Sequence, residues 1–156
     1  TQPRVEYLHN PADRHDTHVA VLVACLDALR RLPVSSRPLE VYGCEVWGDL
    51  DWVPASQTVR LPCPAPEDFG PSLLRCFRSQ IEGGKRYDLA AVGRRRAQAT
   101  FAEAYSPDQT GEVVLALDLL PLMGPNPPSV ADFITGLIDG FKKETIGRIA
   151  EFTKKS

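Results

Sequence analysis

The sequence lacks several features that mark other classes of protein. It has no apolar run close to the roughly 18 residues that cross a bilayer, so we expect no membrane-spanning segment. Its 18 basic and 20 acidic residues give a formal net charge of -2, which provides no strong field for nucleic acid or for an anionic membrane. It has no methionine at its start, and we therefore expect a segment that begins inside a longer protein.

The four cysteines form no C-x-x-C pair, which makes a structural zinc site built from them improbable. Cys25 falls in an apolar helical stretch and Cys44 in a strand-like one, whereas Cys63 and Cys76 stand far from both. We expect all four to be small buried side chains in a reducing compartment, which favours a cytoplasmic protein.

Histidine is scarce, and its distribution is the most informative feature of the chain. All three histidines, His9, His15 and His18, fall within ten residues, together with Asp13 and Asp16. Histidine is the usual proton carrier near neutral pH and the commonest metal ligand. The spacing of His15 and His18 places both on one face of a first helical turn. From spacing alone, a metal or catalytic site and a pair of exposed polar residues at a capped helix both remain open.

The apolar spacing predicts alternating strands and helices, and hence an α/β fold with a mainly parallel sheet. The expected strands cover residues 5–8, 39–47, 57–61 and 112–117, and the expected helices cover 19–32, 72–81, 89–103 and 129–152. Asp16 or Thr17 is the expected N-cap of the first helix. The histidines then follow the carboxyl end of the first strand, where open α/β sheets bind ligands.

We expect residues 1–120 to form the domain. Residues 121–156 combine a proline-rich break with an amphipathic helix, which we expect to pack on the domain or to form an oligomer interface.

Two further sets of residues are candidates for substrate binding. In the run 94–96, three successive arginines on a helix point in different directions, so one or two of them could contact an anionic or hydroxyl-rich substrate. Solvated surface arginines are the alternative. Aromatic and acidic side chains that gather near a strand end can bind a sugar or can be core aromatics beside a capped loop; here they are Tyr42, Glu45, Trp47, Asp49, Asp51 and Trp52. Among these, Glu45 is our candidate substrate contact.

Four segments follow one another in a recognisable order. They are His15-Asp16-Thr17-His18 between a strand and an apolar helix, the strand 41–47, the helix 73–80 ending in Ser-Gln, and Gly93-Arg94-Arg95-Arg96 followed by Phe101-Ala102-Glu103-Ala104-Tyr105. In this order, over residues 5–105, the chain resembles the PIG-L/LmbE-like family of zinc-dependent N-deacetylases. The first segment is similar to the family's His-Pro-Asp-His motif, and the last is similar to its Tyr-Ala-Glu-Ala-Phe signature.

The resemblance implies a Rossmann-like three-layer fold and removal of an acetyl group from an N-acetylated amino sugar. It implies that His18 is a ligand of zinc, or of another divalent ion. It further implies that His15 stabilises an oxyanion or donates a proton, and that Asp16 orients an imidazole. Arg94 and Arg96 become candidate substrate contacts.

The sequence departs from the family pattern in two ways. Thr17 stands where the family has an acidic residue, and the N-terminal His-Pro-Asp-Asp motif, which supplies two metal ligands and a catalytic aspartate, is absent. We therefore expect the C-terminal portion of such an enzyme, its site completed by residues outside this sequence; within it, His9 and Asp13 are the residues that could improvise a site. The alternative is a non-catalytic α/β interaction or assembly module with structural histidines and the helix 129–152 as its interface.

Overall fold

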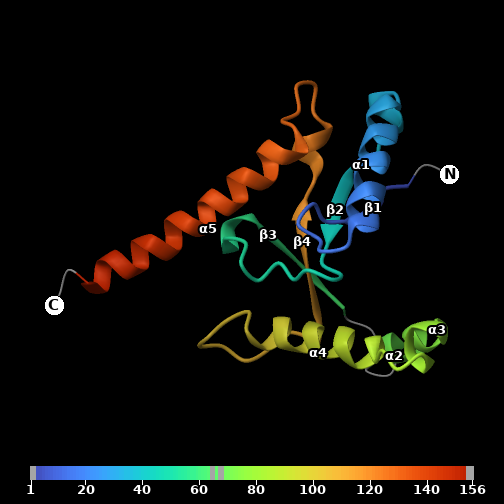
Figure 1. The fold of residues 1–156 in the computed structure, drawn as a ribbon, viewed down its shortest axis with the longest axis vertical. Helices are drawn as coiled ribbons and strands as arrows, with labels where there is room; N and C mark the ends of the chain where they lie inside the picture. Colours follow the sequence, from blue (N-terminus) through green and yellow to red (C-terminus); the bar gives the residue numbers. More distant parts are fainter. Residues whose placement is uncertain (1–2, 64–65, 67–68, 154–156) are drawn as a thin grey trace. The chain divides into compact units, whose positions relative to one another are not determined.

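The structure is a computed structural model that describes residues 3–63, 66 and 69–153 (Figure 1). The chain divides into two compact units. Unit 1 comprises residues 1–59 and 115–156, and unit 2 comprises residues 60–114. All three histidines belong to unit 1.

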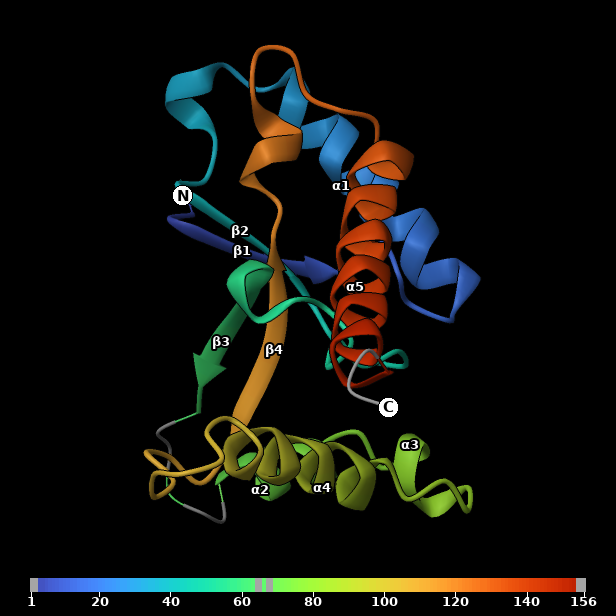
Figure 2. The ribbon, with the colours of Figure 1, turned by 90° about the vertical axis from the view of Figure 1, so that its left-hand side faces the viewer.

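The described strands form one mixed sheet with the order β1-β2-β4-β3. The strands are β1 (Val5–His9), β2 (Glu40–Cys44), β3 (Thr58–Pro62) and β4 (Val113–Asp118). Strands β1 and β2 run side by side in parallel, as Figure 2 shows, whereas β2 and β4 are antiparallel. The expected α/β class is confirmed, but the expected mainly parallel sheet is wrong. Antiparallel pairing needs no crossover helix, so β4 can join β2 directly after the excursion through unit 2.

Helix α1 (Asp16–Arg31) is the crossover that a parallel β1–β2 pair requires. Its residues Leu22 and Leu26 lie one turn apart and are completely buried, because the 3.6-residue period places them on the same face. Among the described residues of unit 1, the fully buried apolar side chains are Leu22, Leu26, Val41, Leu50, Ala116, Leu117, Leu119 and Leu122. The core of unit 1 therefore draws its side chains from α1, β2, β4 and the segments that follow these two strands.

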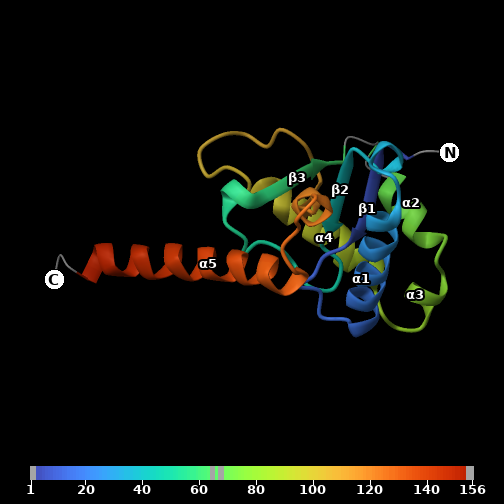
Figure 3. The same cartoon turned by 90° about the horizontal axis from the view of Figure 1, so that it is seen from above.

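Helix α5 (Val130–Thr153) runs without interruption, which confirms the helix expected over 129–152 (Figure 3). The rings of Trp52 and Phe141 form a T-shaped pair with 6.2 Å between their centroids. An added Cβ at Gly140 would lie 3.2 Å from a side-chain carbon of Pro54, so glycine permits this close approach. Within the described residues, no helix combines the length and the apolar character of a bilayer-spanning segment.

Unit 2 contains α2 (Phe69–Arg75), α3 (Ser79–Glu82) and α4 (Tyr87–Thr100). The prediction of a single helix over 72–81 is wrong, because a tight turn separates α2 from α3. There, the N–H of Cys76 bonds to the carbonyl of Leu73, three residues back. Gly84 adopts a φ of 89° shortly after the end of α3, a backbone conformation that glycine adopts without strain.

None of the four cysteines, all of which lie among the described residues, forms a disulfide bond. Three of them are half-buried, but Cys76 is exposed, so the expectation of burial is wrong at that position.

Candidate metal centre

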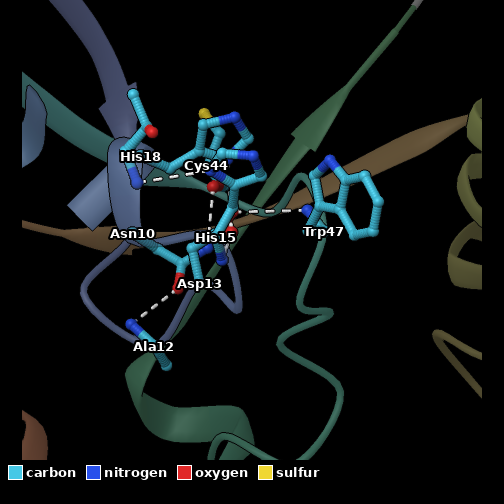
Figure 4. A network of polar contacts seen from close by, with 8 residues as sticks. Asn10, Ala12, Asp13, His15, His18, Cys44 and Trp47 are labelled. Carbon is cyan, nitrogen blue, oxygen red and sulfur yellow. Dashed lines mark hydrogen bonds and ion pairs between the residues drawn. The ribbon is translucent and has the colours of Figure 1, made fainter. Parts of the chain in front are cut away.

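The histidine-bearing loop lies beyond the carboxyl ends of two parallel strands, as predicted. His9 is the last residue of β1 and is paired in register with Cys44, the last residue of β2. Helix α1 begins at Asp16, only seven residues later. The loop 10–15 therefore carries the chain from the strand ends directly into the N-terminus of a helix (Figure 4).

Asn10 anchors the first part of this loop. Its side chain is completely buried, and its Nδ2 donates a hydrogen bond of 2.9 Å to the carbonyl of Cys44. Its Oδ1 accepts a second bond of 2.9 Å from the N–H of Ala12. One amide group thus fixes the turn to the end of β2, and sequence analysis gave it no role.

Asp13 lies at the centre of the site. Its carboxylate accepts the N–H of His15 at 2.9 Å and the N–H of Trp47 at 3.3 Å, and Oδ1 lies 3.2 Å from Nδ1 of His18. Burial acts to raise the pKa of Asp13, but these hydrogen bonds outweigh burial and lower it below the usual value. Asp13 is therefore an ionised carboxylate that connects the loop, the helix start and the segment after β2.

The three imidazoles form a column. The rings of His9 and His18 are stacked with centroids 3.9 Å apart and planes inclined by 3°, and His15 stacks on His18 at 4.6 Å. Burial, followed by the neighbouring His18, lowers the pKa of His9. This favours the neutral imidazole, which is the form that binds metal ions.

His9, Asp13 and His18 can hold a metal ion together, because a potential ligand atom from each lies within 4.8 Å of the other two. The Nδ1 atoms of His9 and His18 are buried without a hydrogen-bond partner, apart from the ion-pair contact of His18 with Asp13. Two imidazoles and a carboxylate are a donor set typical of divalent transition metals such as zinc. The residues present therefore fit the implied metal.

Sequence reasoning identified His18 as a ligand and left His9 and Asp13 as secondary candidates. A local signal could have identified both residues as ligands: His9 ends a strand, Asp13 shortly precedes a helix, and the two flank the same turn.

His15 is exposed and forms the N-cap of α1, so the expected Asp16 or Thr17 cap is wrong. The reason is that Nδ1 of His15 accepts the N–H of Thr17 at 3.3 Å. The neutral ring accordingly carries its proton on Nε2. Asp16 is exposed in the first turn of α1, and the carboxylate that contacts His18 is Asp13. An orienting role for Asp16 stays a prediction.

The three expected substrate contacts belong to different units: Glu45 lies in unit 1, and Arg94 and Arg96 lie in unit 2. Glu45 is buried, and its Oε1 accepts the N–H of Leu115 at 3.0 Å, so its carboxylate anchors β4 beside the end of β2. Arg94 and Arg96 belong to α4 in unit 2, where Nε of Arg96 lies 3.9 Å from Glu112. Substrate contact by these three residues stays a prediction.

Comparisons of the chain with protein-family models, with curated proteins and with solved structures found no match. The resemblance to the PIG-L/LmbE-like deacetylases and the Rossmann-like three-layer arrangement therefore stay predictions.

Proposed function

We propose that this chain is part of a metal-dependent amide hydrolase that deacetylates an N-acetylated amino sugar or a related small molecule. The observation that carries the proposal is the group of His9, Asp13 and His18 at the carboxyl ends of two parallel strands. These residues would hold a divalent ion, with zinc the first candidate, and residues outside this sequence would complete the site.

A bound divalent ion would polarise the amide carbonyl and lower the pKa of a coordinated water. The role of the ionised Asp13 carboxylate is to keep the site assembled, because it bonds to the backbone of both His15 and Trp47 while contacting His18. A buried carboxylate with several hydrogen bonds keeps its position and its charge.

His15 is suited to act on the substrate. Its Nδ1 is occupied by the N–H of Thr17, and the ring is exposed beside His18. The Nε2–H group is then the donor available to a developing oxyanion, at the positive end of the α1 dipole.

The first test is a calorimetric titration of the purified chain with Zn²⁺. We expect about one ion per chain, and we expect His18→Ala to weaken binding by more than about 100-fold, beyond the effect of losing a residue that only orients a ligand. Asp27→Asn, which changes an exposed carboxylate of α1, is the matched control and should bind zinc normally. Full zinc occupancy in His18→Ala would refute the ligand assignment.

His15→Ala separates metal binding from catalysis in the intact protein. We expect it to retain zinc but to release acetate from N-acetylglucosamine about 100- to 1,000-fold more slowly, the usual cost of removing one oxyanion donor. A chain that binds no metal and whose histidine variants lose nothing but stability would instead support the assembly-module alternative.

A further inference from the structure

Trp47 lies at the His15 end of the histidine column. Its ring centroid is 5.9 Å from that of His15, with the ring planes inclined by 59° (Figure 4). The residue is 46% exposed, which is a large apolar surface for a position beside a candidate reactive group. Single exposed apolar residues are ordinary on protein surfaces, so exposure alone does not mark Trp47 as a binding residue.

The backbone of Trp47 is fixed by the metal-site loop. Its N–H donates to Oδ2 of Asp13 at 3.3 Å. The next residue, Gly48, is buried, and an added Cβ there would lie 3.0 Å from the carbonyl oxygen of Ala12. The loop that carries the proposed ligands therefore holds Trp47 in place through main-chain contacts, whereas nearly half of the residue remains exposed to solvent.

The second tryptophan provides a comparison within the same unit. Trp52 is half-buried, and its ring forms a T-shaped pair with Phe141 at 6.2 Å, so it contributes to packing against α5. The ring of Trp47 lies beside an exposed histidine, and 46% of the residue is accessible to solvent. The pre-positioned backbone and exposed aromatic surface are the properties of a binding platform, since aromatic side chains provide rigid contact area at little entropic cost.

We propose that the indole of Trp47 is the surface on which the pyranose ring of the substrate stacks, which brings the acetamido group to His15. This inference rests on the proposed function. The C–H groups on the face of a pyranose are weakly positive, and they match the negative face of an aromatic ring. Trp47 thus selects for a cyclic sugar, whereas the amide itself is recognised at the histidines.

The test compares the binding of N-acetyl-D-glucosamine and acyclic N-acetylethanolamine to the zinc-loaded chain by ligand-detected NMR. We expect Trp47→Ala to weaken binding of the sugar about 10-fold, the upper range for one aromatic contact, and to leave binding of the acyclic amide unchanged. Trp47→Phe should retain most of the affinity because it keeps an aromatic face. Trp52→Phe is the matched control and should bind both ligands as the parent chain does.

Zinc affinity is measured on the same proteins, and Trp47→Ala should leave it unchanged because the bond to Asp13 comes from the backbone. Equal sugar binding by Trp47→Ala and the parent chain would overturn the inference. An equal loss for both ligands, or no sugar binding by the parent chain, would overturn it as well. If zinc fails to bind while the ring-selective loss persists, the proposed hydrolase is wrong and the sugar platform stands.

Discussion

Replacement of Asn10 tests whether one buried amide holds the metal-site loop on the sheet. Asn10→Ala removes the donor to the carbonyl of Cys44 and the acceptor of the N–H of Ala12, both at 2.9 Å. Asn10→Asp keeps an acceptor for Ala12 but places a second carboxylate oxygen against the carbonyl of Cys44. Both changes remove the hydrogen bond that the carbonyl of Cys44, the strand partner of His9, accepts from Asn10.

The expected cost follows from those two bonds. A buried backbone group that loses its partner costs about 1–3 kcal/mol, and the Ala12 end is only half-buried, where water can replace part of the bond. We therefore expect Asn10→Ala to lower the free energy of unfolding by about 2–4 kcal/mol. Asn10→Asp should cost at least as much, because a charge is buried beside a carbonyl oxygen.

Urea unfolding followed by tryptophan fluorescence measures this effect, since both tryptophans, Trp47 and Trp52, belong to unit 1. Asn126→Ala, in an exposed loop, is the matched control and should change the free energy of unfolding by less than about 0.5 kcal/mol. A loss below about 0.5 kcal/mol in Asn10→Ala would refute the view that this side chain anchors the loop.

Two further predictions concern the core of unit 1 and an ion pair of unit 2. Leu26→Ala should destabilise the chain by about 2–5 kcal/mol because Leu26 is completely buried, whereas Leu39→Ala, at an exposed position, should have little effect in the same urea assay. In unit 2, two hydrogen bonds from the Arg86 guanidinium lower the pKa of Asp88 below 3.8. A lowered folded-state pKa stabilises the protein above the unfolded-state pKa, and this contribution is lost as the pH falls through the folded value. Arg86→Gln should move the NMR titration of the Asp88 carboxyl upward, and an unchanged midpoint would contradict the ion pair.

The sequence predicted the element that positions the site because the relevant signals are local. The apolar spacing in α1 and the strand-like run before His9 are both confirmed. The placement of the histidines beyond the strand ends followed from the order of those elements. These features need no knowledge of distant contacts.

The remaining features depend on contacts that the sequence does not display. The direction of β4 relative to β2 is set by pairing between Asp118 and Tyr42, which are far apart in the chain. Asn10 gains its role only when Cys44 lies beside it, and Asp13 gains part of its role from Trp47. The predicted N-cap of α1, Asp16 or Thr17, was wrong. In the structure an imidazole nitrogen of His15 accepts the bond that a carboxylate or hydroxyl oxygen usually accepts.

His9, Asp13 and His18, the ligand donors that the described part of the chain brings together, come from one strand–loop–helix connection of ten residues. Bringing the ends of a flexible segment together costs more entropy as the segment lengthens, by about 0.6 kcal/mol for each doubling. Here the separation is short, so little chain entropy opposes gathering the donors. The site thus acts as a local chelator. Its donors stay close to one another once β1 has paired with β2 and α1 has formed.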